Sequence, residues 1–248
     1  MTDGGDAASA SLAVAALLDG PEQPLRLLSD GSHAQSWATG SDAVLVLESE
    51  HGVHLPNAVH GADVTRLRRL GVRTSVIGGG RWVADGMEVR VRRWWDPVPR
   101  RVDVRAEVVA EVASALLPPP RDPALDMIEE AIGAADPARL VGLGTGSTPG
   151  GDDWLAARLV ALHAVDRGDD AVALWAEVEP HLGATTPFSA DLLRHAARGA
   201  AVLAVHRLLD ALSGRGEPAT ALRDVLALGD TSGWWLARGL TDTLTAHQ

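Results

Sequence analysis

The sequence predicts an α+β protein, with a β-rich N-terminal domain over residues 1–99 that begins with a helix, and an all-helical C-terminal domain over residues 100–248. Three observations predict this fold class. Short apolar or alternating segments around the dipeptide Asp85-Gly86 are typical of strands and a hairpin in the first part. Apolar residues at helical spacing fill the second part. Between them, Pro97 and Pro99 mark the domain boundary.

The first predicted elements of the N-terminal domain are a helix and a buried strand. Residues 7–18 are rich in alanine and predict a helix. Asp3 and Asp6 precede this segment, where a secretory signal would need positive charge, so we do not read it as a signal peptide. The run 43–47 is short, apolar and bounded by charged residues, which predicts a buried strand.

A hairpin follows later in the same domain. Segments 81–84 and 87–95 flank the Asp85-Gly86 turn, and the second of them alternates apolar with charged residues, as a half-buried strand does. The glycine run 78–80 has no helical pattern after it. We therefore expect a bulge or a hairpin corner there, not a phosphate-binding loop.

The C-terminal domain is predicted to consist of helices separated by proline and glycine. A first helix over 103–117 is expected to stop at the triple proline 118–120, and a second follows over 123–133. Later helices are expected to start at Trp154, to run over 190–213, and to start at Trp234.

Composition excludes several kinds of chemistry. The chain contains no cysteine, lysine or tyrosine, so it forms no disulfide, thiolate site, Schiff base or Walker-type lysine contact. Proton transfer must fall to Asp, Glu, His or water, and fixed positive charge to arginine or a metal. A net charge of -11 argues against nucleic-acid binding. Because no apolar run approaches the ~20 residues of a membrane helix, we expect a cytoplasmic protein.

The most informative segment is a glycine-rich loop before the helix that contains Trp154. Glycine at this density suits a backbone that turns tightly and presents N–H groups to a ligand, next to a helix start that favours negative charge. An ordinary loop with Asp152 as helix N-cap is the alternative. We favour the functional interpretation. The loop's candidate anion-binding residues are Gly144, Thr145, Gly146, Ser147, Gly150 and Gly151.

Two further loops have similar chemistry and also precede helices. Each is only a helix cap in isolation, but three such helix starts in one domain favour a shared anion-binding pocket. The second loop contributes Thr185, Thr186 and Ser189 as candidates, and the third contributes Asp230, Thr231, Ser232 and Gly233.

Two aspartates oppose an anion in this pocket. A carboxylate ~4 Å from a phosphate costs roughly 4 kcal/mol at an effective dielectric of 20, whereas one helix end contributes only ~0.3–1 kcal/mol. Asp152 and Asp153 must therefore turn away as helix caps or hold Mg²⁺, and we lean toward the metal. We take Thr148, Asp152, Asp153 and His195 as candidate catalytic residues.

Together, the segments 140–156, 185–199 and 228–240 resemble the AllH-like family. The resemblance covers most of residues 140–245. Positions that fit the family's first motif are Gly144, Gly146, Thr148, Pro149, Gly151, Asp152 and Asp153. Positions that depart from the family pattern are Thr145, Ser147, Gly150 and Asp230.

The resemblance implies a subunit of an oxamate carbamoyltransferase, which converts oxalurate and phosphate into oxamate and carbamoyl phosphate during allantoin breakdown. Other subunits of that complex are the implied partners. Such chemistry needs phosphate and carboxylate held together, and it needs no covalent nucleophile. The alternative is a regulatory subunit that binds an anionic metabolite without catalysis, and Asp230 favours that alternative slightly.

Three other groups of residues are weaker candidates. His195 and Arg198 are expected on one long helix with His206, where they are candidates to contact a bound carboxylate, although a packing role for His195 is the stronger interpretation. Histidines 51, 54 and 60 suggest a metal site, but no carboxylate is expected to support them. The basic and aromatic segment 90–101 predicts a subunit interface in an acidic protein.

Overall fold

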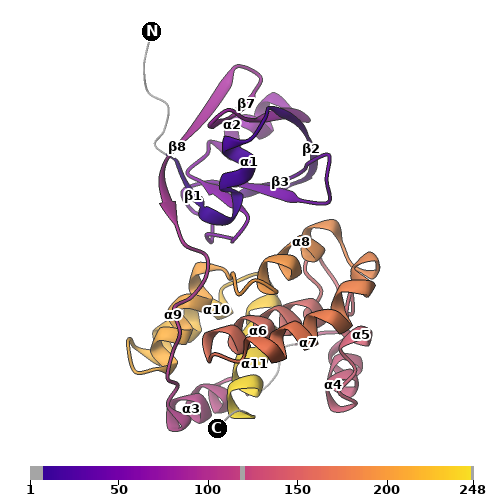
Figure 1. The fold of residues 1–248 in the computed structure, drawn as a ribbon, viewed down its shortest axis with the longest axis vertical. Coiled ribbons are helices and arrows are strands. Elements are labelled where there is room, and N and C mark those ends of the chain that lie inside the picture. Colours follow the sequence, from indigo (N-terminus) through magenta and orange to yellow (C-terminus); the bar gives the residue numbers. More distant parts are fainter. Residues whose placement is uncertain (1–7, 118–120, 247–248) are drawn as a thin grey trace. The chain divides into compact units, whose positions relative to one another are not determined.

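The computed structural model describes residues 8–117 and 121–246, so Asp3, Asp6 and the predicted stop at 118–120 lie outside the described residues. The chain divides into two compact units, Met1–Pro97 and Val98–Gln248. The first is built mainly from strands and the second from helices (Figure 1). The fold is therefore α+β. In the part of the chain that is described, no helix has the length and apolar character needed to cross a membrane.

The first unit is a closed eight-stranded barrel with the strand order β1-β5-β4-β3-β2-β6-β7-β8. Most neighbouring strands are antiparallel, but β1 pairs in parallel with β8, and β4 pairs in parallel with β5. The barrel was not foreseen in the sequence-based fold class. The strands are β1 (Ala8–Ser11), β2 (Gln23–Asp30), β3 (Ala34–Ala38), β4 (Val44–Glu48), β5 (Ala58–His60), β6 (Thr74–Gly78), β7 (Arg81–Ala84) and β8 (Met87–Trp95).

The predicted N-terminal helix is wrong over β1, while residue 7 lies outside the described residues. Only η1 (Leu12–Val14) and α1 (Ala15–Asp19) are helical in this segment. Ala8 and Ala10 are fully buried, and β1 joins β5 on one side and β8 on the other. Strand pairing that closes the barrel thus overrides the weak helical preference of alanine.

Both predicted turns of the barrel are confirmed. Asp85 and Gly86 have positive φ angles and connect β7 to β8 in antiparallel register, as a two-residue turn requires. Gly79 and Gly80 also have positive φ and connect β6 to β7, so the glycine run is a hairpin corner. The predicted strand 43–47 is β4, which is buried along its whole length.

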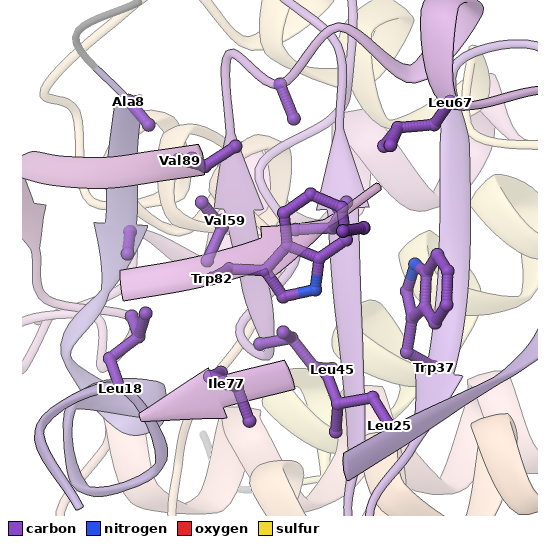
Figure 2. Close-up of a cluster of buried hydrophobic side chains, with 14 of the residues drawn as sticks. Ala8, Leu18, Leu25, Trp37, Leu45, Val59, Leu67, Ile77, Trp82 and Val89 are labelled. Carbon is purple, nitrogen blue, oxygen red and sulfur yellow. The ribbon is translucent and has the colours of Figure 1, made fainter. Parts of the chain in front are cut away.

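The barrel interior is filled by large apolar side chains (Figure 2). Trp37 and Trp82 are fully buried and meet edge to face, with ring centroids 5.8 Å apart. The indole nitrogen of Trp82 donates to the Ser75 hydroxyl at 2.9 Å, so the polar N–H of this buried ring has a hydrogen-bond partner. Helix α2 (Val64–Leu70) adds Leu67 to the same core.

In its described residues, the second unit consists of α-helices and one 3₁₀ helix. They are α3 (Ala106–Ala115), α4 (Leu125–Gly133), α5 (Pro137–Leu140), α6 (Gly150–Ala164), α7 (Gly168–Val178), η2 (Glu179–Ala184), α8 (Pro187–Ala196), α9 (Leu203–Leu212), α10 (Pro218–Leu226) and α11 (Ser232–Thr245).

The predicted helix over 190–213 is wrong because the chain forms two helices, α8 and α9, with a break between them. Gly199 at the break has φ +80, and the Ala200 N–H donates to the His195 carbonyl. A residue in the left-handed conformation ends many α-helices in this way. His195 and His206 therefore lie on different helices and do not share a face.

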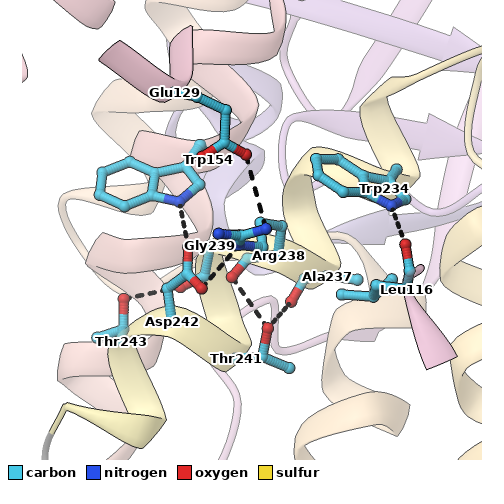
Figure 3. Close-up of polar contacts among 10 residues, drawn as sticks. All are labelled: Leu116, Glu129, Trp154, Trp234, Ala237, Arg238, Gly239, Thr241, Asp242 and Thr243. Atoms are coloured by element: carbon cyan, nitrogen blue, oxygen red, sulfur yellow. Dashed lines mark hydrogen bonds and ion pairs between the residues drawn. The ribbon is translucent and has the colours of Figure 1, made fainter. Parts of the chain in front are cut away.

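Among the described helices of this unit, α6 and α11 share the most extensive packing contact. A Cβ at Gly239 of α11 would lie 2.6 Å from the Trp154 carbonyl oxygen of α6, so the two backbones approach closely there. The Trp154 indole donates to Asp242 at 3.1 Å, and Arg238 binds the same carboxylate at 2.8 Å and faces Glu129 at 3.6 Å (Figure 3). This network ties α4, α6 and α11 together.

Candidate functional site

The three predicted loops meet in the helical unit. The Thr186 hydroxyl at the start of α8 donates to the Ser147 carbonyl of the first loop at 2.6 Å. The Thr148 hydroxyl lies 2.9 Å from the hydroxyl of Ser232, the first residue of α11. The first loop thus contacts the starts of two other helices, while its own end begins α6 (Figure 1). Side chains far apart in the sequence therefore share one small region.

Close approach of backbones explains why the first loop needs its glycines. Gly142 has φ +74, and a Cβ there would lie 2.3 Å from the Ala184 carbonyl oxygen. A Cβ at Gly151 would lie 2.2 Å from the Leu140 carbonyl oxygen. Distances this short exclude any side chain unless the backbone moves. These two glycines are therefore required by packing, whatever binds at the loop.

Helix α6 begins four residues earlier than predicted, at Gly150 instead of Trp154. Its N-cap is Pro149, which makes no side-chain capping bond. Asp152 and Asp153 therefore lie inside the first helical turn, and the alternative of Asp152 as N-cap is wrong. A carboxylate in the first turn still benefits from the positive helix end.

Asp152 is the centre of a buried hydrogen-bond network. One carboxylate oxygen accepts the Gly142 N–H at 2.7 Å. The other accepts the Ser189 hydroxyl at 2.6 Å and also the Thr185 hydroxyl. Burial raises the pKa of Asp152, and these three hydrogen bonds act in the opposite direction. Asp152 thereby connects the first loop, the second loop and α8.

Asp153 is buried in a different way. Burial raises the pKa of Asp153 well above its usual range, and the adjacent charge of Asp152 raises it further. A hydrogen bond from Ser232 acts in the opposite direction. The Oδ2 atom of Asp153 is buried and has no hydrogen-bond partner among the described residues. Burial therefore shifts the ionisation equilibrium of this side chain toward the neutral acid.

The tip of the first loop is the exposed part of the site. Thr145, Gly146 and Ser147 are all exposed. The hydrogen bonds within the described chain give no acceptor for the backbone N–H groups of these three residues. Consecutive N–H groups without a protein acceptor can face an anion, as they do in the concave backbone segments that bind phosphate.

Several predicted site residues have structural surroundings of their own. Gly233 is buried, and a Cβ there would lie 2.0 Å from the Val225 carbonyl oxygen. Thr231 is the N-cap residue of α11 but makes no side-chain capping bond, and Asp230 beside it is exposed. Gly150 is buried against the Trp235 ring, which a Cβ would approach to 2.4 Å.

The structure does not connect His195 and Arg198 to the loops. His195 is nearly buried, and its Nε2 lies 3.5 Å from Asp191 one turn earlier on α8. Arg198 is exposed and follows α8. Within the described residues, no hydrogen bond or ion pair links either side chain to Asp152, Thr148 or Ser232. This arrangement agrees with the packing interpretation of His195.

The residues around the aspartates do not fit a magnesium site. Asp152 already accepts three hydrogen bonds from protein donors, which occupy both of its oxygens, whereas Mg²⁺ is usually bound by one or two free carboxylates. In the described part of the chain, no group of three or more His, Cys, Asp or Glu side chains is arranged to hold a metal ion.

Two contributors to the site were missed from the sequence. Gly142 supplies an N–H to Asp152 although it precedes the motif positions. Trp235 packs on Gly150, and its indole nitrogen donates to Asp122 at 2.9 Å. The adjacent tryptophans 234 and 235 after the third loop were the available signal, because buried tryptophan N–H groups need partners.

The histidines of the barrel have a carboxylate neighbour, so the expectation that none supports them is wrong. Glu48 ends β4 and is buried, and its Oε2 lies 3.5 Å from Nδ1 of His60. The same carboxylate accepts the His54 N–H at 3.0 Å, and the His54 and His60 rings stack at 3.8 Å. His51 lies apart, in edge contact with His33 at 6.0 Å.

Comparison with known families agrees with the resemblance noted from the motifs. Residues 140–244 match the family described as oxamate carbamoyltransferase subunit AllH. The match contains all three converging loops and lies within the helical unit. No curated protein and no solved structure matches the chain significantly. This part of the chain is thus similar to the AllH family, and the barrel lies outside the matched segment.

Proposed function

We propose that this chain is a subunit of a carbamoyltransferase of the oxamate type and that its converging loops bind the anionic substrate. The observation that carries the proposal is the contact of Thr186 with Ser147 and of Thr148 with Ser232. These contacts join three helix starts, each of which contributes a positive dipole end. The similarity of residues 140–244 to the AllH family supports the same enzyme class.

The electrostatics of the two aspartates are compatible with an anion. Burial raises the pKa of Asp153 well above its usual range, which shifts this side chain toward the uncharged acid. The Asp152 carboxylate accepts hydrogen bonds from the N–H of Gly142 and from the hydroxyls of Thr185 and Ser189, and these donors partly offset its negative charge. The repulsion of ~4 kcal/mol expected for an unpartnered carboxylate is therefore reduced without a metal ion.

The proposed role of each group follows from its position. The N–H groups of Thr145, Gly146 and Ser147 bind the oxygens of phosphate or of a carboxylate. Because Ser232 donates its hydroxyl proton to Asp153, the bond between Thr148 and Ser232 uses the Thr148 proton, and Thr148 can donate to the ligand once its hydroxyl rotates away from Ser232. Asp152 is a positioning residue that fixes the loops. Holding phosphate beside a carbamoyl donor is the main requirement of this reaction, because it needs no covalent intermediate.

Reconstitution tests the proposal. The chain is mixed with the other subunits of the complex, oxalurate and phosphate, and carbamoyl phosphate is measured. Thr148→Val should lower kcat/KM for phosphate by roughly tenfold, the effect of losing one hydrogen bond to a charged ligand. Thr74→Val is the matched control, because Thr74 is exposed on β6 of the barrel.

Two outcomes would overturn the catalytic proposal. One is an assembled complex in which Thr148→Val and Thr74→Val both have wild-type kcat/KM. The other is a complex that forms carbamoyl phosphate equally well without this chain. If adding the chain and phosphate then changed only the regulation of that activity, the chain would be an anion-binding regulatory subunit.

A further inference from the structure

A pocket lies in the helical unit, apart from the converging loops. Its volume is about 350 Å³, within the usual range for small-molecule sites. Residues from α4, α5, α6 and α7 line it, and none of the loop residues that contact one another is among them. Its apolar wall consists of Ile132, Leu140, Leu162 and Leu174. Such a wall suits the apolar part of a small ligand.

Arg158 is the cation of this pocket that lacks a protein anion. Its guanidinium carbon lies 5.3 Å from the centroid of the Trp154 ring. Its Nε atom is buried and has no hydrogen-bond partner among the described residues. No carboxylate of the described chain forms an ion pair with Arg158, whereas Arg167 in the same pocket pairs with Asp170. A buried donor without a partner costs free energy, and a bound acceptor removes that cost.

The aromatic wall next to Arg158 is held in place. The Trp154 indole nitrogen donates to Asp242, and Arg238 fixes that carboxylate from the other side (Figure 3). A ring fixed in this way restricts the guanidinium that packs on it. The planar donor group of Arg158 is therefore positioned before a ligand arrives, which lowers the entropy that binding must overcome.

The charges around the pocket limit the ligand to a single negative charge. Asp136, Asp170 and Glu177 also line it. Asp136 accepts the Arg139 N–H as the cap of α5, and Asp170 is paired with Arg167. These carboxylates would still repel a phosphate dianion more strongly than a monoanion.

The geometry points to a second binding site here, for a small monocarboxylate with a short apolar tail. Arg158 binds the carboxylate through its planar N–H groups, which match carboxylate geometry. The tail packs against the leucines of the wall. This site is independent of the proposed anion site at the loops, because the two share no ligand-contacting residue.

Titration of the full chain with butyrate tests the site. Nuclear magnetic resonance follows the Arg158 Nε–H and the Trp154 indole N–H, and both signals should shift with saturation at about 10 mM or below, as weak specific binding requires. Butyramide has the same shape without the charge, and succinate carries a second charge. We expect both to bind more weakly than butyrate. Equal binding of butyramide, or tighter binding of succinate, would overturn the assignment.

Substitutions locate the site independently. Arg158→Gln should weaken butyrate binding by roughly 10- to 100-fold, the effect of losing a charged hydrogen-bond partner. Arg207→Gln is the matched control, because Arg207 is an exposed arginine paired with Asp224. The affinity of this variant for butyrate should equal that of the wild-type protein. Arg158→Lys keeps the charge and should bind with intermediate affinity even if the glutamine variant folds poorly. Unchanged affinity in either Arg158 variant would contradict the proposal.

Discussion

Two glycine-rich segments of this protein look alike in the sequence and differ in what their amides do. In the barrel, Gly79 and Gly80 form a hairpin corner, and their N–H groups donate to the carbonyls of Gly20 and Leu18 at 2.9 and 2.8 Å. In the helical unit, the N–H groups at the tip of the first loop have no acceptor among the described residues. The N–H groups of the first segment donate to carbonyls of the protein itself, whereas those of the second segment are free to donate to a ligand.

The comparison teaches that glycine content alone does not mark a binding loop. What distinguishes the two segments is whether the chain itself accepts their N–H groups. Neighbouring helix starts add a second difference, because only the loop of the helical unit contacts Thr186 and Ser232. The substitutions below test whether the fold of this loop depends on the close approaches and buried hydrogen bonds seen in the structure.

The largest effect is expected for Gly151→Ala. A Cβ there would lie 2.2 Å from the Leu140 carbonyl oxygen. The substitution should lower the free energy of unfolding of the helical unit by about 3 kcal/mol or more, because the added methyl group would collide with backbone atoms, which cannot move aside as a flexible side chain can. Urea unfolding followed by helical circular dichroism measures this loss.

Gly168→Ala is the control for that substitution. Gly168 also lies in the first turn of a helix, α7, but a Cβ added there would have open space around it. Alanine there should leave stability unchanged or raise it by roughly 0.5–1 kcal/mol, through lower backbone entropy in the unfolded chain. Equal unfolding free energies for the two variants would show that the close approach at Gly151 does not constrain the loop.

Asp152→Ala should have the next largest effect. It leaves the Gly142 N–H and the hydroxyls of Thr185 and Ser189 without their acceptor. A loss of about 2–3 kcal/mol in unfolding free energy is expected. Thermal and urea unfolding measure it, with exposed Asp230→Ala as a control that should change stability by no more than about 0.5 kcal/mol. A similar small change at both positions would contradict the proposed positioning role of Asp152.

Asp153→Asn sharpens the electrostatic part of the comparison. Folding raises the pKa of Asp153. The folded state of the wild-type protein is therefore most stable, as far as Asp153 is concerned, at low pH, and it loses stability as the pH rises from about 3.8 to the raised pKa. Asparagine does not ionise. The stability of Asp153→Asn relative to wild type should therefore increase across this pH window, by at most about 1.4 kcal/mol per pH unit. A pH-independent difference would show that folding does not raise the pKa of Asp153.

Local chemistry allowed the sequence to predict some elements and not others. The Asp85-Gly86 hairpin and the glycine corner before β7 were predictable because each turn is determined by two adjacent residues. Barrel closure was not, since β1 pairs with β8 about 80 residues later, and such pairings leave no local pattern. The same limitation produced the incorrect N-terminal helix over Ala8–Ser11.

The site was predictable as a set of loops but not as a network. Hydroxyls and glycines before three helices indicated that the three loops belong together, and the structure brings Thr148 into contact with Ser232 and Thr186 into contact with the carbonyl of Ser147. The sequence did not indicate that Asp152 accepts the Gly142 N–H, because that bond depends on α6 beginning at Gly150. It also gave no sign that Asp153 would be buried, with its pKa raised as a result.

The most direct test of the account is a titration of the whole chain with inorganic phosphate, followed by amide nuclear magnetic resonance. The account predicts saturable shifts of the Thr145, Gly146 and Ser147 N–H signals, while the Gly79 and Gly80 signals stay fixed. Binding should be weakened by Thr148→Val and unaffected by EDTA. Signals of the loop tip that do not move, or that move no more than those of the barrel corner, would contradict the account.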